Sequence, residues 1–292
     1  MQINSPELVL NHPLYSQKQV TVHIKRDDMI HPFISGNKWR KLKYNLVEAE
    51  NQGKKKLLTF GGAWSNHLLA TACAGATYGY KTKAFVRGEE VVNPVLTMCQ
   101  MFGMIIQFVD RDSYRDKKAL FESLESNEDY YFIDEGGSGI EATRGCAELI
   151  EELTNEYEAI FCAAGTGATA AGLAIGIDKI GLNTNLHVVP VLKGGTFIYD
   201  EMKALGASLD KTILHTDYHF GGYAKTKPEL IQFVKEFVAQ TGVMIEPTYT
   251  GKALFALHDL IAKDHFEIDS KILFVHTGGL TGLLGMLDKF SF

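Results

Sequence analysis

One lysine stands in a setting that could turn it into a nucleophile. The segment SGNKWRKL, residues 35–42, opens a predicted helix and places Lys38 at its start. A cation is misplaced there, because the helix dipole favours positive charge at the opposite end. A disfavoured ammonium has a lowered pKa and leaves a free amine that can condense with an aldehyde. The alternative is an ordinary solvated lysine, and the spacing alone leaves both open.

A loop rich in glycine and threonine predicts an anion site. Residues 161–173, FCAAGTGATAAGL, fit a strand, a loop and then a helix of small residues. Helix-start N–H groups and the hydroxyls of Thr166 and Thr169 could hold a phosphate. A dinucleotide fingerprint would need an acid about 20 residues later, and the next strand ends in Lys193-Gly-Gly instead. Close packing of helix on strand through small residues is the alternative.

A second helix start carries polar residues after a paired glycine. Residues 59–68, TFGGAWSNHL, predict a strand, a turn and a helix capped by Ser65. This helix start could bind a substrate carboxylate, with Ser65 as an extra donor and Asn66 bonding another oxygen. A plain N-cap is the alternative for Ser65. His67 is either a base or a packed histidine.

Two later motifs also place polar side chains between a strand and a helix. Tyr249 lies in GVMIEPTYTGKA, residues 242–253, where a phenol could relay protons. Thr277 lies in FVHTGGL, residues 274–280, where a neutral hydroxyl could exchange a hydrogen bond with a ring nitrogen. Either side chain could instead cap its own helix.

Strands that alternate with helical segments must position these residues. The predicted strands are 21–26, 56–62, 82–87, 105–110, 129–134, 159–164, 186–192, 213–218 and 271–276, and the clearest helices are 38–51, 65–78, 141–156, 168–180 and 251–263. Near-continuous apolar strands between helices indicate an α/β fold with mostly parallel sheets. The four units between about residues 50 and 140 could form a smaller sheet. Paired glycines after several strands indicate a shared cleft at the strand ends.

Composition excludes several classes of function. The 292 residues carry a net charge of −6, which argues against a nucleic-acid surface. No apolar run is long enough for a membrane span, and the first residues lack a secretory pattern, so we expect a cytoplasmic protein. The four cysteines lack metal-ligand spacing, and we expect reduced, buried thiols and no metal site.

Taken in order, the five motifs resemble those of the fold-type-II pyridoxal-phosphate enzymes related to the tryptophan synthase β-subunit. The resemblance spans about residues 20–285 and is strongest to the branch holding D-cysteine desulfhydrase and 1-aminocyclopropane-1-carboxylate (ACC) deaminase. It implies two doubly wound α/β domains with the cofactor cleft between them, commonly in a homodimer. Residues 1–48 and 142–292 would form the larger, cofactor-binding domain, and residues 49–141 the smaller one.

The resemblance also implies a role for each matching residue. Lys38 would bind pyridoxal 5'-phosphate covalently and later move protons. The phosphate would be held by Lys41, Thr166, Gly167, Ala168 and Thr169. The remaining roles are Asn66 on the phenolic oxygen of the cofactor, Thr277 on its pyridine nitrogen, Ser65, Asn66 and His67 on the substrate, and Tyr249 with Tyr223 along the substrate face.

Departures from the ACC deaminase pattern favour one reaction. An acid after the active-site tyrosine and an apolar residue in His-x-Gly-Gly are expected there, whereas this chain has Thr250 and Thr277. A neutral hydroxyl suits α,β-elimination, as from D-cysteine to an oxo acid, ammonia and sulfide. The alternatives are ACC ring opening to 2-oxobutyrate and ammonia or, in a different class, a non-covalent nucleotide-binding protein. The bulky Trp39 and Trp64 would narrow the pocket.

Overall fold

Two sheets organise the chain, in a computed structural model that describes residues 3–124 and 127–290. The larger sheet has the order β1 (Glu7–Val9), β2 (Thr21–Lys25), β10 (Lys271–Val275), β7 (Ala159–Ala164), β8 (Asn185–Pro190) and β9 (Thr212–Leu214). Only its β1–β2 pair is antiparallel. The smaller sheet, β5 (Ile105–Val109), β4 (Lys81–Arg87), β3 (Lys56–Gly62) and β6 (Tyr130–Ile133), is parallel throughout. The predicted α/β fold with mostly parallel sheets is confirmed.

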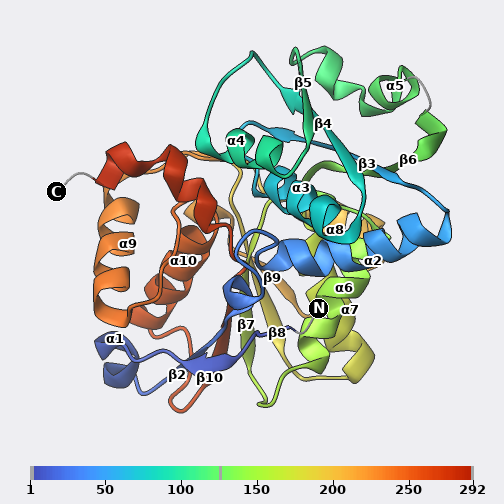
Figure 1. Ribbon diagram of the computed structural model, residues 1–292. Helices are drawn as coiled ribbons and strands as arrows, with labels where there is room; N and C mark the ends of the chain where they lie inside the picture. The colour runs from blue at the N-terminus through green and yellow to red at the C-terminus, as the bar shows by residue number, and fades with distance from the viewer. Residues whose placement is uncertain (1–2, 125–126, 291–292) are drawn as a thin grey trace.

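Helices cover both faces of the larger sheet (Figure 1). On one face lie α1 (Pro13–Gln17), α9 (Pro228–Thr241) and α10 (Thr250–Ala262), and on the other α6 (Ile140–Glu151), α7 (Ala168–Ile180) and α8 (Phe197–Ala204). Around the smaller sheet lie α3 (Asn66–Tyr78), α4 (Pro94–Met101) and α5 (Lys117–Glu122). No helix within the described ranges combines the length and apolar character that a membrane span requires.

Strand β7 shows why the larger sheet is buried on both sides. Phe161 and Ala163 face the core under α9 and α10, while Ile160 and Cys162 face the core under α6 and α7. Successive side chains of a strand point to opposite faces, so a strand covered twice must be apolar at every position. All four cysteines are buried free thiols, as the sequence predicted.

Helix α2 (Asn37–Asn51) lies between the two sheets and contacts both layers. Its apolar residues Leu42 and Leu46 pack with Leu57 of β3. On its other side it meets α6 so closely that a Cβ on Gly145 would lie 1.9 Å from the Arg40 carbonyl oxygen. The domain boundaries predicted near residues 48 and 141 stay a prediction, although all four strands of the smaller sheet fall between them.

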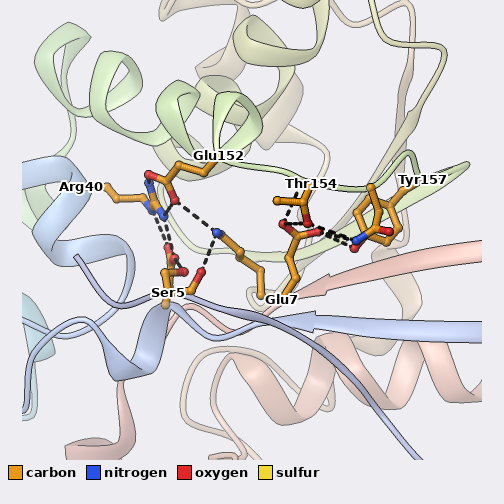
Figure 2. A network of polar contacts seen from close by, with 9 residues as sticks. Ser5, Glu7, Arg40, Glu152, Thr154 and Tyr157 are labelled. Atoms are coloured by element: carbon orange, nitrogen blue, oxygen red, sulfur yellow. Dashed lines mark hydrogen bonds and ion pairs between the residues drawn. The ribbon is translucent and has the colours of Figure 1, made fainter. Parts of the chain in front are cut away.

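A buried ion network fixes the first turns of α2 (Figure 2). The Arg40 guanidinium, only 2% exposed, donates to both carboxylate oxygens of Asp27 at 2.6 and 2.8 Å and to both of Glu152 at 2.8 Å. Lys25 adds an ion pair to Glu152 at 3.2 Å, and Ser5 donates to Asp27 at 2.6 Å. This bidentate pairing compensates the buried charges and ties α2 to the larger sheet and to α6.

Several elements differ from the sequence prediction. The predicted strand 213–218 is wrong beyond Leu214, because residues 216–219 form a 3₁₀ turn. The predicted helix 141–156 ends at Glu151, since Thr154 and Asn155 bind the Glu7 carboxylate instead of continuing the helix. No bounds were predicted for β1, α1, α4, α5, α8 and α9. Of these, α1, α4 and α9 do carry a start signal, a proline at the first helical position.

A buried histidine pair predicts that the protein becomes less stable in acid. His187 lies on β8, and His215 directly follows β9. Nδ1 of His187 lies 2.9 Å from Nε2 of His215. Burial lowers the pKa of His187 to about 3 and that of His215 to about 4, with the neighbouring histidines acting in the same direction. Because these pKa values lie below the ordinary value near 6.5, stability is complete above about pH 6.5 and falls as the pH decreases toward about 4.

Each buried histidine should cost up to about 1.4 kcal/mol of unfolding free energy per pH unit over that window. Denaturant unfolding at about pH 7 and about pH 5 measures the loss, and His187→Phe should make it smaller. An equal loss in His187→Phe and the unaltered protein would contradict this assignment.

Candidate active site

A cavity of about 490 Å³ opens where the carboxyl ends of strands from both sheets face one another. It brings together residues that lie more than 200 positions apart in the sequence. The predicted site residues that line it are Lys38, Lys41, Ser65, Asn66, His67, Thr166, Gly167, Thr169, Tyr223, Tyr249 and Thr277. Ala168 is fully buried as the first residue of α7 and does not line the cavity, so only its backbone could serve a ligand.

Lys38 and Lys41 share one wall of the cavity, one helical turn apart on α2. Both ammonium nitrogens reach the Gly136 carbonyl oxygen, at 3.1 Å for Lys38 and 3.2 Å for Lys41. Burial holds the pKa of Lys38 well below that of an ordinary lysine, and the neighbouring Lys41 lowers it further. Burial also lowers the pKa of Lys41. The structure therefore lowers the proton affinity of the amine at position 38, which is the direction required by one of the two interpretations that the sequence left open.

The loop before α2 requires glycine because it crosses the loop after β10 at very short range. Gly36 has φ +62°, and a Cβ there would lie 1.9 Å from the Thr277 carbonyl oxygen. The same carbonyl accepts from the Asn37 N–H at 3.2 Å, while Asn37 Nδ2 donates to Thr169 Oγ1 at 2.8 Å. These contacts place the start of α2 beside both Thr277 and the threonine-rich turn.

The predicted anion cradle is the N-terminus of α7. Gly167, with φ +80°, turns the chain into a 13-residue helix whose first N–H groups have no intrahelical partner. Thr169 is 6% exposed, and its Oγ1 accepts the bond from Asn37. A Cβ on Gly165 would lie 3.2 Å from the Tyr249 ring, so the absence of a side chain keeps that ring against the cradle.

Ser65 and Asn66 stand at the N-terminus of α3. Ser65 is the N-cap residue, yet its side chain makes no capping hydrogen bond. Its hydroxyl is therefore not used in the plain N-cap role that the sequence left open. Asn66 Nδ2 donates to the Gly279 carbonyl oxygen at 3.2 Å, and its Oδ1 accepts from Thr281 at 2.5 Å. One amide proton of Asn66 remains for a ligand.

His67 is 1% exposed and lines the same cavity as Lys38 and Lys41. Its Nε2 lies 2.7 Å from Thr59 Oγ1, which itself donates to the Ile133 carbonyl oxygen, so His67 donates from Nε2. Its Nδ1 is buried without a partner. Burial, and then Lys38 and Lys41, hold the pKa of His67 well below its usual value. The geometry thus gives a packed, neutral imidazole that still offers one free acceptor to the cavity.

Two tyrosines line the cavity as a contacting pair. The ring centroids of Tyr223 and Tyr249 lie 5.9 Å apart in an edge-to-face arrangement. Burial raises the pKa of both phenols, that of Tyr249 well above its ordinary value. Both hydroxyls are therefore protonated at neutral pH and can donate a hydrogen bond.

The two tryptophans differ in their position. The expectation that Trp39 narrows the pocket is wrong, because its ring is 6% exposed in the apolar core and stacks on Tyr78 at 6.1 Å. Helical phase turns it away from the cavity that its neighbour Lys38 lines. Trp64 does line a second cavity of about 270 Å³, which shares Ser65, Asn66 and both tyrosines with the first.

Many of the residues that line the cavity were not among the predicted site residues, and four of them bear on its chemistry. Asn37 and the Gly136 carbonyl position the lysine wall, and Arg87 and Glu135 add charge near it. The paired glycine at 136–137 and the polar side chains at the ends of β4 and β6 were the available signals, since ligands bind beyond the carboxyl ends of parallel strands.

This set of groups fits a phosphate-bearing aldehyde. Burial lowers the pKa of the Lys38 amine, the α7 terminus offers unpaired N–H groups with Lys41 close by, and Thr277, which is 7% exposed, lines the same cavity with its hydroxyl group. An anion would also compensate the two lysines that now face one carbonyl oxygen.

Curated relatives match almost the whole chain. A Thermotoga maritima protein, provisionally named 1-aminocyclopropane-1-carboxylate deaminase, is 32% identical over 283 residues, covering 90% of this chain and 89% of the relative. A mitochondrial bifunctional D-cysteine desulfhydrase/1-aminocyclopropane-1-carboxylate deaminase from Arabidopsis thaliana is 31% identical, covering 92% of this chain and 74% of the relative.

Solved structures agree with this match. The crystal structure of an ACC deaminase homologue superposes with a TM-score of 0.89 at 29% identity, covering 99% of this chain and 93% of that one. A hydrogen sulfide-producing enzyme from Fusobacterium nucleatum, with a TM-score of 0.71 at 15% identity, shares the fold. The sequence matches the pyridoxal-phosphate dependent enzyme family over residues 5–278, which favours this cofactor over the nucleotide that the loop alone left open. The chain belongs to the family of pyridoxal-phosphate dependent enzymes, of fold type II.

Proposed function

We propose that this enzyme removes ammonia from a small amino acid by α,β-elimination, with D-cysteine as the leading substrate and sulfide as the leaving group. The observation that carries the proposal is the buried position of the Lys38 amine in the cavity that also contains an anion cradle and a second helix start. Burial holds its pKa well below the ordinary value, which shifts the amine toward its uncharged form. Condensation with an aldehyde and abstraction of a proton both require this uncharged form.

When bound, pyridoxal phosphate supplies an electron sink for charge released at the substrate α-carbon. Lys38 Nζ would hold the cofactor and, once released, would take up the α-proton. Its low proton affinity in the free site would suit both tasks, because an ammonium can do neither. Lys41 and the amides of residues 166–169 would keep the phosphate fixed, so the amine and the reacting carbon stay aligned.

The start of α3 would orient the substrate. Its unpaired N–H groups and the free Ser65 hydroxyl would bind the carboxylate, and the spare Asn66 proton would bind the cofactor oxygen. The unpartnered Nδ1 of His67 would accept a hydrogen bond and would repel a cation less than a charged imidazole would. Tyr249 and Tyr223, protonated at neutral pH, would give a proton to the departing group.

Thr277 would meet the pyridine nitrogen with a neutral hydroxyl. Such a partner leaves that nitrogen mostly unprotonated and the electron sink weaker, which is sufficient when the β-substituent is a good leaving group. Ring opening of ACC, which lacks an α-proton, is the second candidate, and the names of the relatives favour it. A homodimer, a cytoplasmic location and the absence of nucleic-acid partners remain predictions of the sequence.

Replacing the proposed cofactor lysine tests the covalent link. Purified protein loaded with pyridoxal phosphate should show a visible absorption band that borohydride removes, and Lys38→Ala should lack the band and lose activity by at least about a hundredfold. Lys43→Ala is the matched control, because this lysine lies on the same helix but pairs with Glu148 at 2.6 Å. A normal band in Lys38→Ala would refute the assignment.

A substrate panel separates the two reactions. Both enantiomers of cysteine and serine, together with ACC, should be assayed for sulfide, for pyruvate and for 2-oxobutyrate. We expect sulfide with pyruvate from D-cysteine at the highest kcat/KM. Formation of 2-oxobutyrate from ACC without any sulfide from cysteine would overturn the elimination proposal in favour of ring opening.

The Thr277 hydroxyl should control protonation of the bound cofactor. Thr277→Glu places a carboxylate beside the pyridine nitrogen and should raise its proton affinity, since an opposite charge stabilises the protonated ring. Absorption spectra recorded across pH should then change at a higher pH than in the unaltered protein. Thr277→Ser, which keeps the hydroxyl, should retain the original profile, and an unchanged Thr277→Glu profile would exclude this contact.

A further inference from the structure

Lys252 is a fully buried cation that lies outside the active-site cavity. It is 0% exposed and occupies the first turn of α10, three residues after Tyr249. Its ammonium donates to three main-chain carbonyl oxygens, those of Gly222 at 2.7 Å, His219 at 2.8 Å and Val191 at 3.3 Å. All three ammonium protons are thereby used, and each of the three acceptors is a main-chain carbonyl oxygen, not a carboxylate.

Two of those carbonyls belong to the segment that presents Tyr223. Gly221 and Gly222 have φ +98° and +118°, and the flanking Phe220 and Ala224 have φ +50° and +53°. Residues other than glycine rarely adopt positive φ, so this conformation persists only where surrounding contacts impose it. This segment comprises residues 219–225. Lys252 binds the carbonyl oxygens of His219 and Gly222, and Gly222 is the residue directly before Tyr223.

The third carbonyl joins this segment to the larger sheet. Val191 follows β8, and its N–H donates to the last residue of β7, Ala164, at 2.9 Å. The cavity residue Gly165 comes next in the chain. Lys252 therefore connects the Tyr223 segment to the same strand ends that lead into the anion cradle.

A buried carboxylate, that of Glu246, binds the main chain around the second tyrosine, Tyr249, in a similar way. The Glu246 carboxylate, 1% exposed, accepts from the N–H groups of Thr248 at 2.6 Å, Tyr249 at 2.9 Å and Thr250 at 2.8 Å. Burial lowers the pKa of Lys252 to about 8, and the Glu246 charge acts against that shift, so the ammonium is largely charged at neutral pH. The main chain next to each tyrosine is thus bound by a buried side chain: Lys252 binds the carbonyls before Tyr223, and Glu246 binds the N–H of Tyr249.

We propose that Lys252 is a positioning residue for Tyr223: its ammonium holds the 219–222 carbonyls so that the phenol stays against Tyr249 and the substrate. The inference rests on the proposed function, in which Tyr223 faces the substrate. It assigns to Lys252 no contact with substrate or cofactor.

Hydrogen exchange tests the physical part without any activity measurement. Lys252→Met keeps most of the unbranched side chain but removes the terminal ammonium, and with it the charge and the three donors. Amides of residues 219–225 should exchange at least about tenfold faster in this variant, while amides of β7 keep their protection. Lys211→Met is the matched control, because this lysine donates to the Leu182 carbonyl oxygen at 2.7 Å, away from the cavity. Unchanged exchange over 219–225 in Lys252→Met would overturn the proposal.

Kinetics test whether the effect passes through Tyr223. On the substrate identified by the panel, Lys252→Met should lower kcat by about tenfold or more with little change in KM, while Lys211→Met should leave both unchanged. In a Tyr223→Phe background, Lys252→Met should have almost no further effect on kcat. Two effects that multiply would refute positioning of Tyr223 and leave a general loss of structure.

Two further outcomes, a variant that does not fold and an enzyme without activity on the panel, can be distinguished from failure of the positioning proposal. If Lys252→Met does not fold, Lys252→Gln, which keeps two donors, undergoes the same exchange and kinetic comparisons, with the same results supporting or overturning the proposal. If the unaltered enzyme turns over no compound of the panel, the proposed function fails, whereas the exchange measurement still decides whether Lys252 holds residues 219–225.

Discussion

The bidentate pairing of Arg40 with Asp27 and Glu152 is the constraint on which the position of the reactive lysine depends. A guanidinium that is 2% exposed must have its charge compensated, and two carboxylates from different parts of the chain do so. Residues two positions apart on a helix point to nearly opposite sides. Anchoring Arg40 to the larger sheet and to α6 therefore turns Lys38, on the same helix, toward the cavity. The approach of Gly145 to Arg40 leaves α2 no room to rotate.

Desolvation then sets the chemistry within the cavity. Burial lowers the pKa of Lys38, Lys41 and His67 in the free protein, and the neighbouring lysine charge lowers those of Lys38 and His67 further. A bound phosphate brings negative charge to this cluster, so cofactor binding and the protonation of Lys41 should favour each other. The tyrosine pair has the opposite property, since burial keeps its phenols protonated. Potential proton acceptors and donors thus line the same cavity.

Glycines at the loop crossings permit this arrangement. The crossing of Gly36 and Gly278 brings the start of α2 against the end of β10, where a Cβ on Gly278 would lie 2.4 Å from Ser35 Oγ. Buried ionisable side chains outside the cavity support the same geometry: Arg40 anchors α2, and Lys252 and Glu246 bind the main chain next to Tyr223 and Tyr249. Positions with no direct ligand contact therefore hold much of the precision of the site.

The sequence alone determined the α/β class, the smaller four-stranded sheet and most of the candidate residues that the fold brings to one cavity, because strand–helix alternation and the five ordered motifs are local signals. It did not reveal the end of the strand at Leu214, the core position of Trp39 or the common contact of Lys38 and Lys41 with Gly136. Tertiary structure alone decided these features, since they depend on which distant groups bury a charge or occupy a space. Hydrogen bonds such as those of Lys252 to three carbonyls leave no trace in spacing, because any residue provides a carbonyl oxygen.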